Sequence, residues 1–105
     1  MINVKITPNG FTCTGHADSA PYGSDIVCAA VSALVQATVL ALETDLIFIK
    51  SKKINSGNVE IKYFPKVWRC IDEQMKLEYI ILPMRLGLAE IAKQYPDKIK
   101  VEINT

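Results

Sequence analysis

A chain of 105 residues with a formal net charge of +1 has the size of one globular domain and lacks the basic excess of nucleic-acid-binding proteins. Half of its residues are hydrophobic, which provides for a core and excludes an intrinsically disordered chain. Residues 1–6 alternate apolar with polar side chains, so we expect no signal peptide. We therefore predict a single domain over residues 1–105 without direct nucleic-acid contact.

The chain has three cysteines, Cys13, Cys28 and Cys70, and one histidine, His16. An odd number of cysteines without paired spacing does not make a disulfide framework, so a reducing, cytoplasmic location is expected. One histidine with scattered cysteines also lacks the spacing of zinc ligands. We expect neither a metal nor a cofactor.

The first elements form a predicted β-hairpin. Residues 2–6 alternate as a half-buried strand does, and Asn9-Gly10 is a strong hairpin turn signal. Residues 11–16 form the return strand, in which Phe11, Cys13 and Gly15 share one face. His16 lies on the other face and should point away from Cys13.

A loop over residues 17–23 separates this hairpin from a helix predicted over residues 25–42. Ser24 or Asp25 can cap the helix, because each side-chain oxygen can accept from a free first-turn amide. Residues 26–42 are almost wholly apolar but fall short of the roughly 20 residues of a membrane span. We predict a core helix covered by the sheet, a second helix and a partner subunit, with no membrane contact.

The second half of the chain is predicted as strand, helix and strand. Residues 43–50 fit a helix extension or a strand, and residues 51–58 read as a polar turn region. Residues 59–63 alternate as a strand. Apolar residues then recur at helical spacing from about Val67, and Pro83 predicts a kink or two helices meeting there.

Residues 99–103 alternate again and supply a final strand. This order of elements predicts an α+β fold. We expect a two-layer domain with a small mixed or antiparallel sheet and helices packed on one face.

His16 and Cys28 are the candidate catalytic residues. A strand ending at His16 and a helix starting just before Cys28 can bring imidazole and thiol together across a reversing loop. A cysteine in the first turn of a helix is easier to ionise, because free amides and the macrodipole favour negative charge there. Spacing alone also fits a structural role, in which Cys28 is a small buried residue, as we assume for Cys13 and Cys70.

Two polar residues flank the cysteine. Asp25 lies three residues before Cys28 on the same helical face, and it either caps the helix, orients His16 or holds substrate. Ser32 lies one turn after Cys28, and it either bonds a carbonyl one turn back or supports the site.

Two segments carry a resemblance to a known family. Gly15-His16-Ala17 and the block from Tyr22 to Leu34, which includes Asp-Ile-Val-Cys-Ala-Ala-Val-Ser, closely resemble the signature of the bacterial ribosomal-processing cysteine proteases, the Prp family. The resemblance extends over essentially the whole chain apart from residues 43–58. The family's motif falls on five positions without departure: Gly15, His16, Asp25, Cys28 and Ser32.

The resemblance implies a bacterial cytoplasmic peptidase, usually a homodimer, that removes a short N-terminal extension from the large-subunit ribosomal protein L-twenty-seven. It makes Cys28 the nucleophile and His16 the general base and later acid, with residues 17–24 as a gate over substrate. Gly15, Asp25 and Ser32 would support this dyad.

Two other hypotheses remain open at this point. One is a non-enzymatic peptide-binding module in ribosome assembly, whose cleft holds a peptide without cutting it. The other is a thiol redox sensor built on Cys28.

Overall fold

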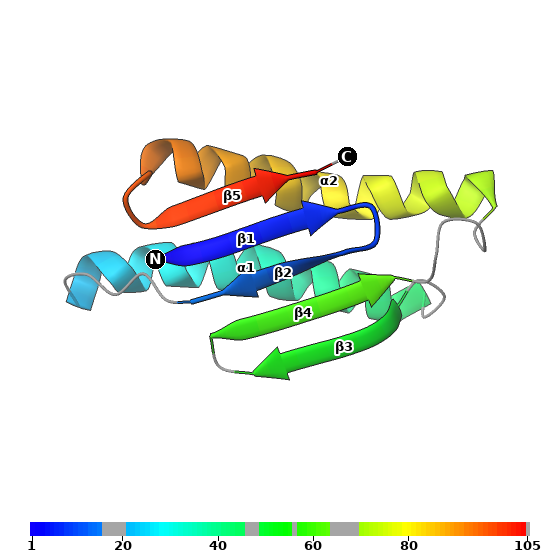
Figure 1. The fold of residues 1–105 in the computed structure, drawn as a ribbon, viewed down its shortest axis with the longest axis horizontal. Helices are drawn as coiled ribbons and strands as arrows, with labels where there is room; N and C mark the ends of the chain where they lie inside the picture. Colours follow the sequence, from blue (N-terminus) through cyan, green and yellow to red (C-terminus); the bar gives the residue numbers. More distant parts are fainter. Residues whose placement is uncertain (16–20, 46–48, 56, 64–69, 105) are drawn as a thin grey trace.

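Five strands form one sheet, and two long helices cover one of its faces (Figure 1). This computed structural model describes residues 1–15, 21–45, 49–55, 57–63 and 70–104. The elements follow in the order β1 (Ile2–Thr7), β2 (Gly10–Thr14), α1 (Pro21–Asp45), β3 (Ile49–Asn55), β4 (Asn58–Tyr63), α2 (Ile71–Gln94) and β5 (Ile99–Ile103). The predicted α+β, two-layer fold with its helices on one face is confirmed.

The sheet is mixed, with strand order β3-β4-β2-β1-β5. Neighbouring strands pair antiparallel except β1 and β5, which run parallel. A parallel pair needs a long crossover connection. The chain passes from β4 through α2 to β5, which pairs with β1 and forms the second edge of the sheet (Figure 1).

The predicted hairpin between β1 and β2 is confirmed. Gly10 has φ +154°, and a Cβ built there would lie 2.1 Å from the carbonyl oxygen of Ile61 on β4. The hydroxyl of Thr7 donates to the carbonyl of Gly10 at 3.1 Å and closes the turn. Glycine is therefore required both by the turn and by the close approach of β4.

Helix α1 supplies the central apolar row of the core. Its buried residues recur every three or four positions, and each is at most 4% exposed: Val27, Val31, Val35, Val39 and Leu42. By length and composition alone, Ile26–Thr44 is apolar enough to cross a membrane. In this structure its buried row packs in one cluster with the sheet and α2, as expected of a core helix.

The start of α1 differs from the prediction. The helix begins at Pro21, so Ser24 and Asp25 lie inside it and the expected N-cap at either residue is wrong. Proline suits the first helical position because its φ is already helical and its missing N–H has no partner to lose there. Residues 21–23 of the predicted loop are therefore helical, and residues 17–20 of that loop lie outside the described residues.

Two predictions for the second half also need correction. Residues 51–55 belong to β3 rather than to a polar turn, because an edge strand needs few apolar side chains. Pro83 lies within one continuous helix, so of the two predicted outcomes, a kink or a meeting of two helices, the second is wrong. The row Leu77, Ile81, Met84 and Leu88 is buried on both sides of Pro83, and this packing offsets the lost hydrogen bond.

Candidate active site

A cavity of about 630 Å³ lies along α1, between this helix and the inner faces of β2, β4 and β3. It lies toward the β3 edge of the sheet, where most of β3 and part of β4 extend beyond the two helices (Figure 1). The side chains of Val31, Val35 and Val39 face it from the core side, and Ile54 and Val59 line it from the hairpin. The cavity is therefore an open groove with apolar walls.

Cys28 lies on α1, is half-buried and lines this cavity. It stands seven residues after Pro21, about two turns into the helix. The prediction that Cys28 occupies the first turn is therefore wrong, and the helix dipole, whose effect fades within the first turn, adds little at this position.

Gly15 brings the end of β2 to the rim of the same cavity. Its N–H donates to the carbonyl of Gly57 at 2.9 Å, which fastens this residue to the turn after β3. Its φ of +90° and a built Cβ only 2.4 Å from the carbonyl oxygen of Met1 exclude other residues at this position. The backbone directly before His16 is thus fixed beside the cavity that holds Cys28.

His16 itself lies outside the described residues, and so does the side chain of Asp25. The predicted contact between imidazole and thiol stays a prediction. Ser32 is exposed one turn after Cys28 and lines the cavity. The structure thus brings Gly15, Cys28 and Ser32 together around one groove.

Sequence reasoning missed Cys13 as a part of this site. Phe11 is buried and Cys13 packs against the core, so the predicted inward face of β2 is confirmed. Cys13 also lines the cavity. Burial, and then the charge of nearby Cys28, raise the pKa of the Cys13 thiol. The inward alternation of β2 was the signal that could have pointed to this position.

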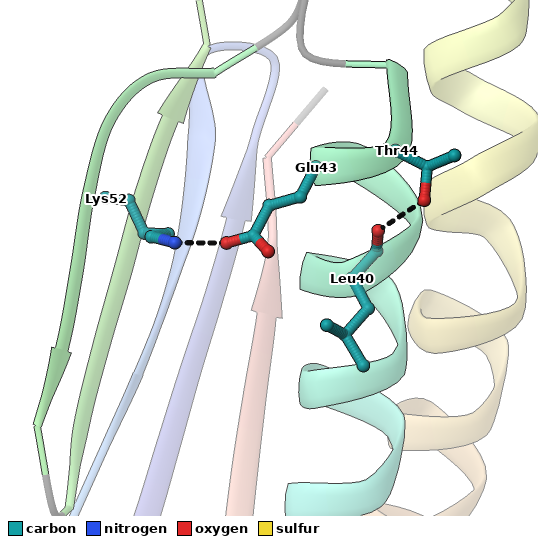
Figure 2. Close-up of polar contacts among 4 residues, drawn as sticks. All are labelled: Leu40, Glu43, Thr44 and Lys52. Carbon is teal, nitrogen blue, oxygen red and sulfur yellow. Dashed lines mark hydrogen bonds and ion pairs between the residues drawn. The ribbon is translucent and has the colours of Figure 1, made fainter.

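An ion pair closes the far end of the cavity. Lys52 on β3 donates to the carboxylate of Glu43 on α1, and the two side chains meet across the gap between sheet and helix (Figure 2). Nearby, the hydroxyl of Thr44 donates to the carbonyl of Leu40 at 2.9 Å within the last turns of α1 (Figure 2). From Cys28 to Glu43 the groove runs along about 22 Å of helix.

No group of three His, Cys, Asp or Glu side chains that could hold a metal ion occurs in the parts of the chain that the structure describes. The polar side chains that line the groove are two thiols, the hydroxyl of Ser32, the carboxylate of Glu43 and three amides, Gln36, Asn55 and Asn58. A half-buried thiol beside a fixed backbone segment is suited to nucleophilic attack on a bound carbonyl.

Replacing Gly15 by alanine should lower the free energy of unfolding by about 1–3 kcal/mol, because the Cβ meets the Met1 carbonyl and the backbone is held at positive φ. Urea unfolding measures this. Gly87→Ala is the control, since its Cβ meets only the flexible Leu34 side chain, and it should change stability by less than about 1 kcal/mol. Equal losses in both variants would contradict the role of Gly15.

The chain is similar in sequence to known cysteine proteases. The family model for the cysteine protease Prp matches residues 1–100. The ribosomal processing cysteine protease Prp of Mycoplasma genitalium is 30% identical over 102 residues, which cover 96% of this chain and 94% of that protein.

Two solved structures share the fold over nearly the whole chain. The ribosomal processing protease Prp from S. aureus, in complex with a covalently linked product peptide, is 27% identical with a TM-score of 0.79, covering 99% of this chain and 100% of the other. A protein from Streptococcus mutans is 27% identical with a TM-score of 0.77, covering 98% and 93%. With a family model matched over residues 1–100 and a half-buried cysteine lining an open groove, the chain belongs to the Prp family of ribosomal-processing cysteine proteases.

Proposed function

We propose that this chain is a cysteine endopeptidase of the cytoplasm that removes the N-terminal extension of the large-subunit ribosomal protein L-twenty-seven. Residues 1–105 would act as one domain without a metal or cofactor. The observation that carries the proposal is the position of Cys28, half-buried in a long groove and matching the cysteine of the family's motif. Membership in a family of ribosomal-processing cysteine proteases supports the substrate class.

In the proposed mechanism His16 accepts the proton of the Cys28 thiol, and the sulfur attacks the peptide carbonyl. His16 then gives the proton to the leaving amine, and water hydrolyses the thioester. This dyad fits the position of Cys28 beyond the first turn of α1, where the helix dipole adds little. Gly15 fixes the backbone that carries His16, and Asp25 either orients the imidazole or contacts substrate, with Ser32 as support.

The groove along α1 suits an extended peptide. Its length of about 22 Å corresponds to six or seven residues of a strand-like chain on one side of the cleaved bond. The walls offer apolar contact to alternate side chains, and the Glu43–Lys52 pair ends the groove with charge. We infer that substrate lies parallel to α1 between Cys28 and this pair.

Cys28→Ala should yield no cleavage product, and His16→Asn should lower kcat by about 10²–10⁴ because proton transfer is lost. The substrate is L-twenty-seven with its extension, and mass spectrometry follows the cut. Cys70→Ser is the control, since Cys70 is exposed at the start of α2 and does not line the groove. Normal cleavage by Cys28→Ala would contradict the assignment, and a substrate bound but left intact by the wild-type protein would favour the peptide-binding module.

Lys52→Gln should raise KM about two- to fivefold with little change in kcat, because a partly exposed ion pair that holds the groove's end is worth less than about 1 kcal/mol. Lys53→Gln is the matched control. Lys53 is the next residue of β3, and its register partner on β4 is Glu60. Because side chains alternate between the two faces along a strand, Lys53 lies on the opposite face of the sheet from Lys52. An equal KM for both variants would place the substrate elsewhere.

We also infer a homodimer, as the family resemblance implies. An exposed apolar row with a spacing of four residues supports this inference: Ile71, Met75 and Tyr79 on α2, exposed by 74%, 49% and 68%. Such a row is costly to leave in water.

Light scattering should give twice the chain mass for the wild type, and the double variant Met75→Glu, Tyr79→Glu should shift it to the monomer mass. Lys76→Glu is the control, because Lys76 lies beside the row without belonging to it. A wild-type monomer at micromolar concentration would contradict the dimer.

A further inference from the structure

The groove contains a second thiol that the proposed mechanism does not use. Cys13 on β2 and Cys28 on α1 line the same cavity from opposite walls. Both are half-buried and pack against the same core cluster. Cys70, at the start of α2, is exposed and is not among the residues that line this cavity.

The two thiols also interact electrostatically. Negative charge on Cys28 raises the pKa of Cys13 further than burial does alone. Charge–charge effects of this kind fall with distance, which agrees with the position of both residues on the wall of one cavity. The raised pKa favours the protonated thiol at Cys13.

We propose that Cys13 and Cys28 form a reversible disulfide across the groove, which switches the enzyme off under oxidising conditions. The proposal rests on the assignment of Cys28 as the nucleophile. It goes beyond that assignment because Cys13 has no part in peptide cleavage. The proposed disulfide gives Cys13, on the inward face of β2, a chemical function.

The chemistry is a two-electron oxidation by a peroxide. The Cys28 thiolate attacks one peroxide oxygen, the O–O bond breaks, and Cys28 becomes a sulfenic acid while hydroxide leaves. The Cys13 sulfur then attacks the Cys28 sulfur, the S–O bond breaks, and water leaves with the thiol proton. A dithiol reductant reverses the change by thiol–disulfide exchange. The reductant gives up two electrons and becomes a disulfide, while Cys13 and Cys28 return to thiols.

Two consequences follow from the position of this bond. The nucleophile is consumed, and a bridge between β2 and α1 crosses the groove where substrate would lie. Cys13 also protects Cys28, because a sulfenic acid that condenses to a disulfide escapes irreversible oxidation to the sulfinic acid.

The test uses the reduced full-length wild-type protein with Cys13→Ser and Cys70→Ser, exposed to graded hydrogen peroxide. Residual thiols are then alkylated and counted by intact mass. Oxidised wild-type protein should retain one alkylatable thiol, Cys70, and should lose two hydrogen atoms of mass. Oxidised Cys70→Ser should retain none, and Cys13→Ser should instead gain oxygen atoms.

Locating the bond requires a suitable protease. Trypsin leaves both cysteines in one peptide, because residues 6–49 contain no lysine or arginine. Cleavage at Asp18 and Asp25 separates them, so a disulfide appears as two linked peptides that reductant releases.

Activity gives the second readout. Wild type and Cys70→Ser should lose cleavage with peroxide and regain nearly all of it with dithiol, whereas Cys13→Ser should stay largely inactive. Cys13→Ala, with circular dichroism, replaces Cys13→Ser if the serine variant fails to fold.

Absence of linked peptides, or equal recovery of Cys13→Ser and wild type, would overturn the switch. A disulfide that forms without loss of cleavage would instead overturn the assignment of Cys28 as nucleophile.

Discussion

The packing of one row of α1 against the sheet is the constraint on which the site depends. Val27, Val31 and Val35 are almost fully buried together with the inner faces of β1 and β2. Burial of these valines sets the rotation of α1 about its axis, and this rotation also determines which residues lie beside the buried row. Cys28 and Ser32, each one residue beyond a buried valine, must then face the groove. The packing of the core therefore determines the position of the site.

The groove itself follows from the ratio of strands to helices. On β4, Ile61 and Tyr63 belong to the core, whereas Val59 and its neighbour Ile54 on β3 line the cavity. At its far end Glu43 and Lys52 connect α1 to the edge strand. The edge strand can be polar on its outer face because it needs no second covering layer. An open groove of this shape suits an extended chain more than a compact small molecule.

The position of Cys28 within α1 changes the account of its reactivity. A cysteine in the first turn would gain from free amides, but the helix starts two turns earlier, at Pro21. In addition, Cys13 lines the same cavity, and burial followed by the charge of Cys28 raises the pKa of its thiol. In the proposed mechanism the imidazole of His16 is the base that accepts the thiol proton of Cys28. The two thiols that line this groove are the basis of the proposed redox switch.

The sequence by itself determined the hairpin at Asn9-Gly10, the apolar core helix, the fold class and the family, because turn chemistry, periodicity and a motif are local. Only the tertiary structure decided that Cys13 shares a cavity with Cys28, since two residues on different elements meet through packing. It also decided that polar residues 51–55 form a strand, because pairing with β4 outweighs their weak propensity. The start of α1 at Pro21 was likewise beyond local signals, which favour loop and first helical turn alike.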